Sequence, residues 1–182
     1  MKPQLEVLNI HELLTTTFPK LEYLIEPQLL SPGGSLIIYG KRETGKSWLS
    51  IDLAFALSQG QPWLIFPTKQ CKVWIVQVEQ PMIQYHDRLL NYSTQHFGYV
   101  NGNLPHDYLK ITTDLSFKLQ NVFDFSILKQ AIEIHRPDVI ILDNMYRVVN
   151  VYEPQQTVDF LSFLSCMQQE FECAWILNHH PR

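Results

Sequence analysis

The sequence lacks long apolar runs and paired cysteines, and these absences narrow the class of protein. No apolar stretch approaches the roughly 18 residues that a membrane-spanning helix needs, so we expect no membrane span. The N-terminus, MKPQLEVLNIHELL, has no extended apolar segment, which argues against a signal peptide. The three cysteines show no C-x-x-C spacing, which favours reduced thiols in a cytoplasmic protein.

Positive charge is also scarce. The formal net charge is −4 and the pI is about 5.9, so no overall basic surface indicates a nucleic-acid partner. Any contact with DNA or RNA would need a local patch or a ring of loops. There is no low-complexity tract and no internal repeat. With 182 residues, 46% of them hydrophobic, the chain has the length and composition of one globular domain.

Strand-like and helix-like segments alternate along most of the chain. The expected strands are near-continuous apolar runs, as in a sheet that is buried on both faces, and they cover residues 36–39, 73–78, 108–112, 139–142 and 174–177. The expected helices cover residues 46–59, 82–96, 125–135 and 155–172. This order predicts an α/β fold, a three-layer αβα sandwich with a mainly parallel sheet over residues 31–182. Residues 1–30 read as an N-terminal arm.

A glycine-rich loop joins the first of these strands to the first helix. It fits G-x-x-x-x-G-K-[ST] without a gap, which is the Walker A or P-loop pattern. Its glycines let backbone N–H groups surround phosphate oxygens, the lysine reaches the β- and γ-phosphates, and the serine hydroxyl binds Mg²⁺. The loop and the residue after it are the expected nucleotide-binding residues: Gly40, Lys41, Arg42, Glu43, Thr44, Gly45, Lys46, Ser47 and Trp48.

The expected cofactors are therefore ATP and Mg²⁺, with Lys46 acting on the phosphates and Ser47 on the metal. The alternative is a plain strand-to-helix turn without a ligand, which the surrounding strand and helix make much less favourable. The three variable positions at residues 41–43 are bulky and charged. We expect them either to be solvated or to contact a neighbouring subunit.

Two acidic residues follow apolar strands. Asp143 ends VIILD, where a P-loop protein holds Mg²⁺ next to the loop serine, although any buried strand can end in aspartate. Glu79 ends VWIVQVE, the strand after the P-loop helix, where a carboxylate can polarise the attacking water. The alternative for Glu79 is an acid at the start of the next helix. On that helix, Asp87 and Arg88 are expected on the solvated face.

The last predicted strand runs into Asn178-His179-His180-Pro181-Arg182. A hydrogen-bond donor at this point can report whether the γ-phosphate is present. A zinc site is the rival for two adjacent histidines, but it lacks further Cys or His at ligand spacing. A surface loop is the third reading, because His-His-Pro suits any turn.

With these elements in place, the chain resembles the RecA-like P-loop ATPases, and within these AAA-type ATPases the RepA/DnaB-type hexameric helicases. The resemblance rests on the P-loop, on VWIVQVEQP with Arg88 beyond it, on VIILDNMYRV and on the His-His ending. It implies that Glu79 is the catalytic base, Asp143 the magnesium aspartate and His179 the γ-phosphate sensor, with His180 as the alternative. It also implies a homo-oligomeric ring, such as a hexamer, with nucleotide at the subunit interface and an arginine finger from the neighbour.

The resemblance leaves the target of hydrolysis open. Tyr146 and Arg147 lie where such proteins place a loop that contacts single-stranded DNA, but they suit packing against the following helix equally well. Related cores continue past this last strand, so the chain reads as a fragment or as a reduced version. We expect an ATP-hydrolysing enzyme acting on DNA as a helicase or loader. The alternative is a nucleotide-dependent assembly or switch module acting on protein partners, with weak or no turnover.

Overall fold

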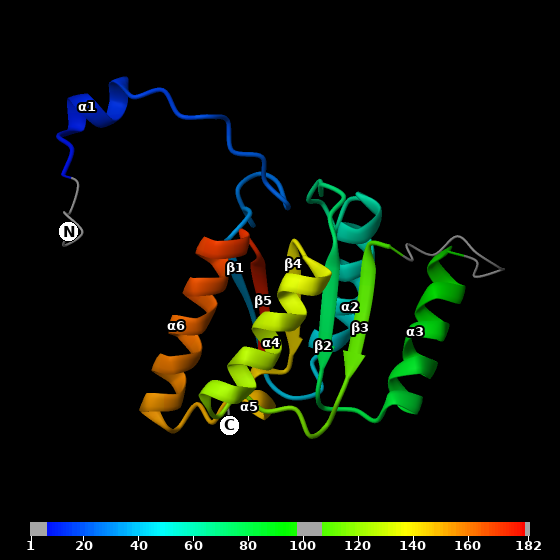
Figure 1. Cartoon of the computed structure of the whole chain (residues 1–182). Coiled ribbons are helices and arrows are strands. Elements are labelled where there is room, and N and C mark those ends of the chain that lie inside the picture. Colours follow the sequence, from blue (N-terminus) through cyan, green and yellow to red (C-terminus); the bar gives the residue numbers. More distant parts are fainter. Residues whose placement is uncertain (1–6, 98–106, 181–182) are drawn as a thin grey trace.

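A five-stranded sheet forms the centre of the molecule, and all its strands are parallel (Figure 1). The computed structural model describes residues 7–97 and 107–180. The strands are β1 (Ser35–Tyr39), β2 (Val73–Gln77), β3 (Leu109–Thr113), β4 (Val139–Asp143) and β5 (Ala174–His179). Their order across the sheet is β1-β5-β4-β2-β3, so β5 separates the P-loop strand β1 from β4, which carries Asp143.

Helices cover both faces of this sheet. One face packs against α2 (Lys46–Gln59) and α3 (Met82–Phe97), and the other against α4 (Val122–His135) and α6 (Pro154–Phe171). The four-residue helix α5 (Met145–Val148) lies at the end of the sheet to which the strands point (Figure 1). The predicted three-layer α/β sandwich is confirmed. Within the described ranges, no helix combines the length and the apolar character needed to cross a bilayer.

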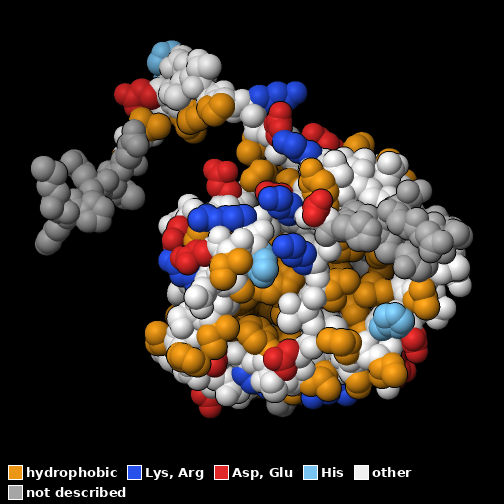
Figure 2. All heavy atoms as spheres, turned by 45° about the vertical axis from the view of Figure 1, so that its right-hand side comes forward, with side chains coloured by type: hydrophobic (Ala, Val, Ile, Leu, Met, Phe, Trp, Pro, Cys, Tyr) orange, Lys and Arg blue, Asp and Glu red, His pale blue; other side chains and the backbone are white. Residues whose placement is uncertain are grey.

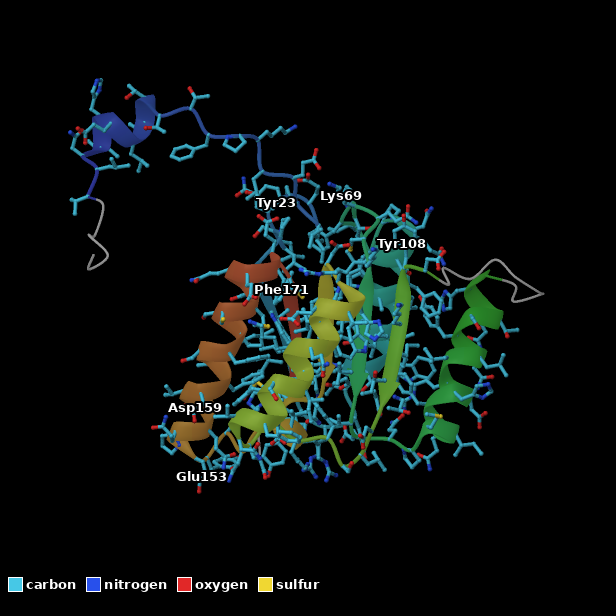
Figure 3. The ribbon with its side chains drawn as sticks, in the orientation of Figure 1. Tyr23, Lys69, Tyr108, Glu153, Asp159 and Phe171 are labelled. Atoms are coloured by element: carbon cyan, nitrogen blue, oxygen red, sulfur yellow. The ribbon has the colours of Figure 1, made fainter. Side chains whose placement is uncertain are left out.

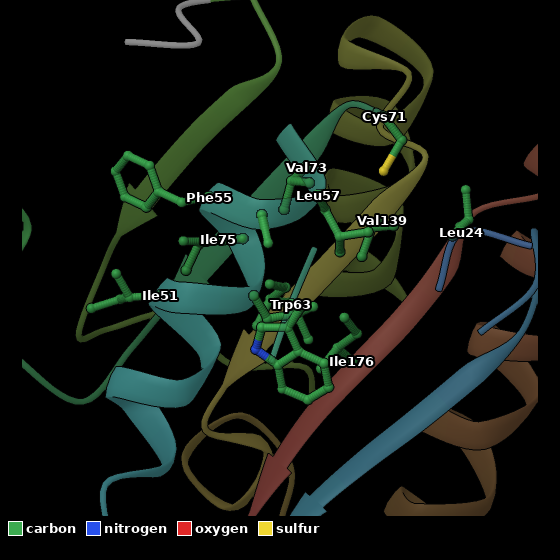
Figure 4. Packing of buried hydrophobic residues seen from close by; sticks show 14 of the residues in the cluster. Leu24, Ile51, Phe55, Leu57, Trp63, Cys71, Val73, Ile75, Val139 and Ile176 are labelled. Carbon is green, nitrogen blue, oxygen red and sulfur yellow. The ribbon is translucent and has the colours of Figure 1, made fainter. Parts of the chain in front are cut away.

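The side chains of successive strand residues belong alternately to two separate hydrophobic clusters, one on each face of the sheet. Val73 and Ile75 of β2 face the α2 side, where Leu57 and Trp63 pack with them (Figure 4). Their neighbours Trp74 and Val76 face α4 and α6 instead. Because side chains alternate along a strand, a strand buried on both faces must be apolar at every position. This explains the continuous apolar runs that predict the sheet.

Glycine and asparagine mark where the helices begin and end. Gly45 and Gly60 adopt left-handed φ values of 87° and 66° at the two ends of α2, a conformation that side chains with a Cβ disfavour. Asn121 caps α4 by accepting hydrogen bonds from the N–H groups of Phe123 and Asp124. The predicted helix over residues 125–135 therefore begins too late, because apolar periodicity marks the buried face and misses the capped first turn.

The N-terminal arm stands clear of the body (Figures 1 and 2). No residue of its helix α1 (Ile10–Thr15) is buried. The boundary expected at residue 30 falls inside a packed segment, since Leu24, Ile25 and Leu30 belong to the core beside α2. An ion pair between Glu22 and Lys69 fastens this lead-in to the body near Tyr23, at the end of the sheet opposite α5 (Figure 3).

Candidate functional site

The P-loop connects the carboxyl end of β1 to the first turn of α2, as predicted. Its lysine is already folded over the loop: the Lys46 ammonium donates to the carbonyl oxygens of Gly40 (2.9 Å) and Lys41 (2.6 Å). The Thr44 hydroxyl donates to the same Lys41 carbonyl at 2.8 Å. The left-handed backbone at Gly45 turns the loop into the helix. The loop is therefore preformed, with a positive charge at its centre where phosphate oxygens are expected.

A cavity of about 480 Å³ opens beside this loop, at the carboxyl ends of β1, β2, β4 and β5. Ligands of parallel α/β sheets bind at this edge. Residues from four separated parts of the chain line the cavity: Arg42, Glu43, Gly45, Lys46, Ser47, Trp48, Glu79, Gln80, Arg88, Asp143, Asn144, Arg147 and His180. The structure thus brings together the predicted P-loop pair, the predicted base and the predicted magnesium aspartate.

Asp143 is a buried acid at the bottom of the cavity, only 4% exposed. Burial raises the pKa of its carboxyl, and the nearby side chains of Asn178 and Ser47 counteract this only in part. None of the ion pairs among the described residues involves Asp143. The charge of Arg88 acts on this carboxyl without forming an ion pair with it. A buried carboxylate beside a serine hydroxyl is an oxygen donor set that suits Mg²⁺.

The backbone of β4 holds Asp143 and Glu79 close together. Gln77 pairs with Asp143 in the parallel ladder, and the N–H of Val78 donates to the Asp143 carbonyl oxygen at 2.9 Å. Glu79 follows directly, and its carboxylate accepts a hydrogen bond from the Asn144 side-chain amide at 3.1 Å. Glu79 therefore lines the cavity, which leaves the prediction that it is the base geometrically sound.

Arg88 lies in the cavity lining and not on a solvated face of α3, so that prediction is wrong. Its guanidinium lies 5.0 Å from the centre of the Trp48 ring. The Gln80 amide lies next to the same guanidinium, and with its oxygen turned toward Arg88 it accepts from both terminal nitrogens, at 2.8 and 3.2 Å. Contacts of Arg88 with Trp48 and of Tyr92 with Phe55 turn this side of α3 toward α2 and the P-loop. The cavity therefore has a second fixed positive charge besides Lys46.

The rings of the two histidines at the end of β5 are nearly parallel, with their centroids 6.4 Å apart, but they contact different neighbours. His180 is 7% exposed, lines the cavity and contacts the Tyr146 ring at 5.4 Å. His179 contacts the Tyr39 ring of the neighbouring strand at 5.7 Å. The pKa of His179 is lowered by burial, by His180 and by Lys46, so its ring still lies within electrostatic reach of the loop. The role of γ-phosphate sensor stays a prediction, and the position of His180 favours this alternative over His179.

The segment after Asp143 forms α5. The Tyr146 ring packs edge-on against Tyr152 at 6.0 Å, while Arg147 is exposed. The Lys118 ammonium donates to the Arg147 carbonyl oxygen, and both residues line a second cavity of about 350 Å³ together with Tyr146. Tyr146 thus packs against the start of the following segment, whereas Arg147 faces both cavities.

A third cavity, of about 640 Å³, adjoins the first and shares Gly45, Lys46 and Trp48 with it. Beyond the P-loop it is lined by groups of α2 and α3 that include Asp52 and Tyr92. The Tyr92 hydroxyl donates to the Asp52 carboxylate. The cavity beside the P-loop therefore opens onto additional room next to aromatic and acidic side chains.

Sequence reasoning missed Asn144 and Asn178. Asn178 is fully buried, and its Oδ1 accepts from the Ser50 hydroxyl at 2.9 Å, which orients the amide beside Asp143. Asn144 directly follows the predicted metal aspartate and precedes a short helical stretch, and asparagine at that place is a recognised capping signal. Asn178 offered no comparable signal, because its burial depends on strand pairing.

A zinc centre finds no support in the described ranges, where no group of three or more His, Cys, Asp or Glu side chains could hold a metal. A search of curated proteins finds none that matches the sequence. A family model described as an AAA domain matches residues 2–182, which is nearly the whole chain. Together with the P-loop and the parallel sheet, this match shows that the chain belongs to the AAA domain family of P-loop ATPases.

Proposed function

We propose that the chain binds ATP with Mg²⁺ and hydrolyses it, with Glu79 activating the attacking water. Lys46 and Arg88 hold phosphate oxygens, and Ser47 and Asp143 hold the metal, which supplies positive charge against the phosphates. His180 reads the γ-phosphate from the end of β5. Asp143 carries the metal and not the proton transfer, because its carboxyl is the more deeply buried of the two.

One observation carries this proposal. A P-loop lysine, a strand-end aspartate and a strand-end glutamate, which are 33 or more residues apart in sequence, line a single cavity at the sheet edge. Each has the chemistry that phosphoryl transfer needs, namely charge neutralisation, metal binding and orientation of water. A phosphate-binding turn alone would not require the two carboxylates.

Two substitutions test the proposal. Lys46→Ala should abolish ATP binding, measured by titration with a fluorescent ATP analogue. Glu79→Gln should keep binding but lose most of the turnover, on the order of a hundredfold or more. Unchanged nucleotide affinity in Lys46→Ala would remove the central claim. Unchanged turnover in Glu79→Gln would reduce the chain to a binding domain.

We infer that DNA is the target, in a helicase or loader of the RepA/DnaB type. The support is the second cavity next to α5, where Lys118, Arg147 and the Tyr146 ring combine positive charge with an aromatic surface. ATP turnover should rise with single-stranded DNA, and DNA binding should weaken steeply with salt. Arg147→Ala should reduce both effects. Absence of DNA stimulation together with absence of salt-sensitive binding would exclude this target.

A nucleotide-dependent assembly or switch module is the second candidate. The net charge of −4 and the exposed apolar arm favour it, since the arm offers a surface for protein and not for nucleic acid. Under this function, ATP changes the oligomeric state in light scattering, and DNA changes neither turnover nor assembly. A DNA-stimulated ATPase in the same preparation would decide for the first candidate.

A further inference from the structure

Asn144 lies where the nucleotide cavity meets α5. It is 2% exposed and follows Asp143 directly in the chain. Its side chain caps α5, because Oδ1 accepts a hydrogen bond from the N–H of Arg147 at 3.1 Å. The NH₂ group of a buried asparagine also needs a hydrogen-bond partner, and here that partner is Glu79.

The hydrogen bonds fix which way this amide faces. A backbone N–H can only donate, so the oxygen of Asn144 must point at Arg147, and Nδ2 must then point away from it. Nδ2 donates to Oε2 of Glu79 at 3.1 Å. Turning the amide over would set donor against donor at one end and acceptor against acceptor at the other. The pair therefore holds the Glu79 carboxylate as an acceptor in one place.

Glu79 has little else to orient it. Its backbone is fixed through Val78, which donates to Asp143, but its side chain has three rotatable bonds beyond the strand. Within residues 7–97 and 107–180, the Asn144 amide is the one hydrogen-bond donor to that carboxylate. A base that must direct a water molecule gains rate from being held in place, and a displacement of about 1 Å can cost about a hundredfold in rate.

We propose that Asn144 is the positioning residue for Glu79, and that through it the hydrolytic base is tied to α5. The proposal rests on the proposed function, because it needs Glu79 to act in hydrolysis. The same amide group bridges the capped turn and the carboxylate, so a shift of α5 moves the group that holds Glu79. Arg147, whose N–H the amide accepts, also lines the cavity beside Lys118. A ligand in that cavity would therefore contact Arg147, the residue that is hydrogen-bonded to Asn144.

Asn144→Ser tests the positioning contact. Serine is a good capping residue and preserves α5, but its hydroxyl is too short to take the place of the amide at Glu79. We expect kcat to fall about 10- to 100-fold while the dissociation constant for ATP changes less than about twofold. Asn144→Asp is the second variant, since it is nearly isosteric and replaces the donor by an acceptor, and it should lose more. Asn121→Ser makes the same change at the exposed cap of α4 and should leave kcat unchanged.

A double-mutant cycle separates positioning from a general structural effect. If Asn144 acts through Glu79, then Asn144→Ser should have almost no further effect on single-turnover rates in a Glu79→Gln background. Equal fold losses in both backgrounds would overturn the proposal, as would a wild-type kcat in Asn144→Ser. A wild-type chain without any turnover would instead overturn the proposed function and this inference with it. The two failures are therefore distinct.

Discussion

Asp143 combines an acidic side chain with deep burial, and the side chains of Asn178, Ser47 and Arg88 offset the cost of burying its charge only in part. Taking a carboxylate out of water disfavours its charged form, which is why the pKa of Asp143 is raised. Without a cation the residue therefore destabilises the fold. The same carboxylate is thus a candidate metal ligand and a group that lowers the stability of the chain when no metal is bound.

Asp143→Asn should separate these two roles. The neutral amide removes the buried charge, so Tm without ligand should rise, by about 2–4 °C for each kcal/mol gained. The further rise in Tm that Mg²⁺ and ATP give the wild-type chain should disappear. Differential scanning fluorimetry with and without Mg²⁺ measures both. Asp159→Asn removes an acid from the exposed face of α6 and serves as the control (Figure 3). A lower Tm without ligand would contradict the prediction.

His179 makes stability depend on pH. Because its pKa in the folded chain lies below the ordinary value of 6.5, the unfolded chain takes up the proton more readily. Stability should therefore be full above about pH 7 and should fall as pH drops through the ordinary pKa of histidine. His179→Gln should flatten this part of the curve, measured by urea unfolding at a series of pH values. His86→Gln, at an exposed position on α3, should keep the wild-type slope.

At the scale of elements, α6 packs one stripe against the sheet, with Phe160, Leu164 and Met167 buried, and leaves the adjoining stripe in water. Leu164 is 4% exposed and Leu161 is 51% exposed, one turn apart on the same helix. Leu164→Ala should lower the free energy of unfolding by about 2–4 kcal/mol through lost burial and a cavity. Leu161→Ala should cost less than about 1 kcal/mol. Urea titration of the two variants compares identical changes, and equal losses would contradict the packing of α6.

Most elements of this fold could be predicted because their apolar pattern is strong. The helix over residues 46–59 has the predicted bounds, and each predicted strand lies within one or two residues of the observed one. The helix α5 was missed because four residues are too few to show a period. Its cap, Asn144, was missed with it, although the pattern of Asp143 followed by asparagine stood in the sequence.

For the site residues, the sequence predicts which strand ends carry them but not which side chains face the cavity. Motif spacing places Lys46, Ser47, Glu79 and Asp143 at strand ends, and the structure puts all four around one cavity. β5 ends at His179, so the alternation of side chains along a strand does not tell which of the two histidines lines the cavity. That depends on the pairing of β5 with β1 and β4. Arg88 was assigned to solvent for a related reason, since only the packing of α3 on α2 decides its face.

At the scale of the whole molecule, the arm and the carboxyl ends of the strands lie at opposite ends of the sheet (Figure 1). The arm carries apolar side chains that nothing in the described body covers, among them Ile10, Leu14 and Phe18, which are 70%, 76% and 63% exposed. Their spacing of four places Ile10 and Leu14 on one side of α1. Exposed apolar groups in such a row mark a protein contact. We propose that the partner at this contact is a second copy of the chain, as in the homo-oligomeric ring that the resemblance to RepA/DnaB-type helicases implies.

Leu14→Asp should therefore weaken assembly. A charge in the apolar row has to be desolvated on contact, which costs several kcal/mol and shifts the population toward monomer. Light scattering coupled to size-exclusion chromatography, with ATP and Mg²⁺ present, should show a smaller average mass at equal concentration. Thr17→Asp adds the same charge to the arm at a polar position and should leave the mass unchanged. Because no residue of α1 packs on the body, Tm of the monomer should be the same in both variants. An unchanged mass in Leu14→Asp would exclude the arm as the contact between copies. It would favour the alternative that the charged P-loop residues 41–43 contact a neighbouring subunit.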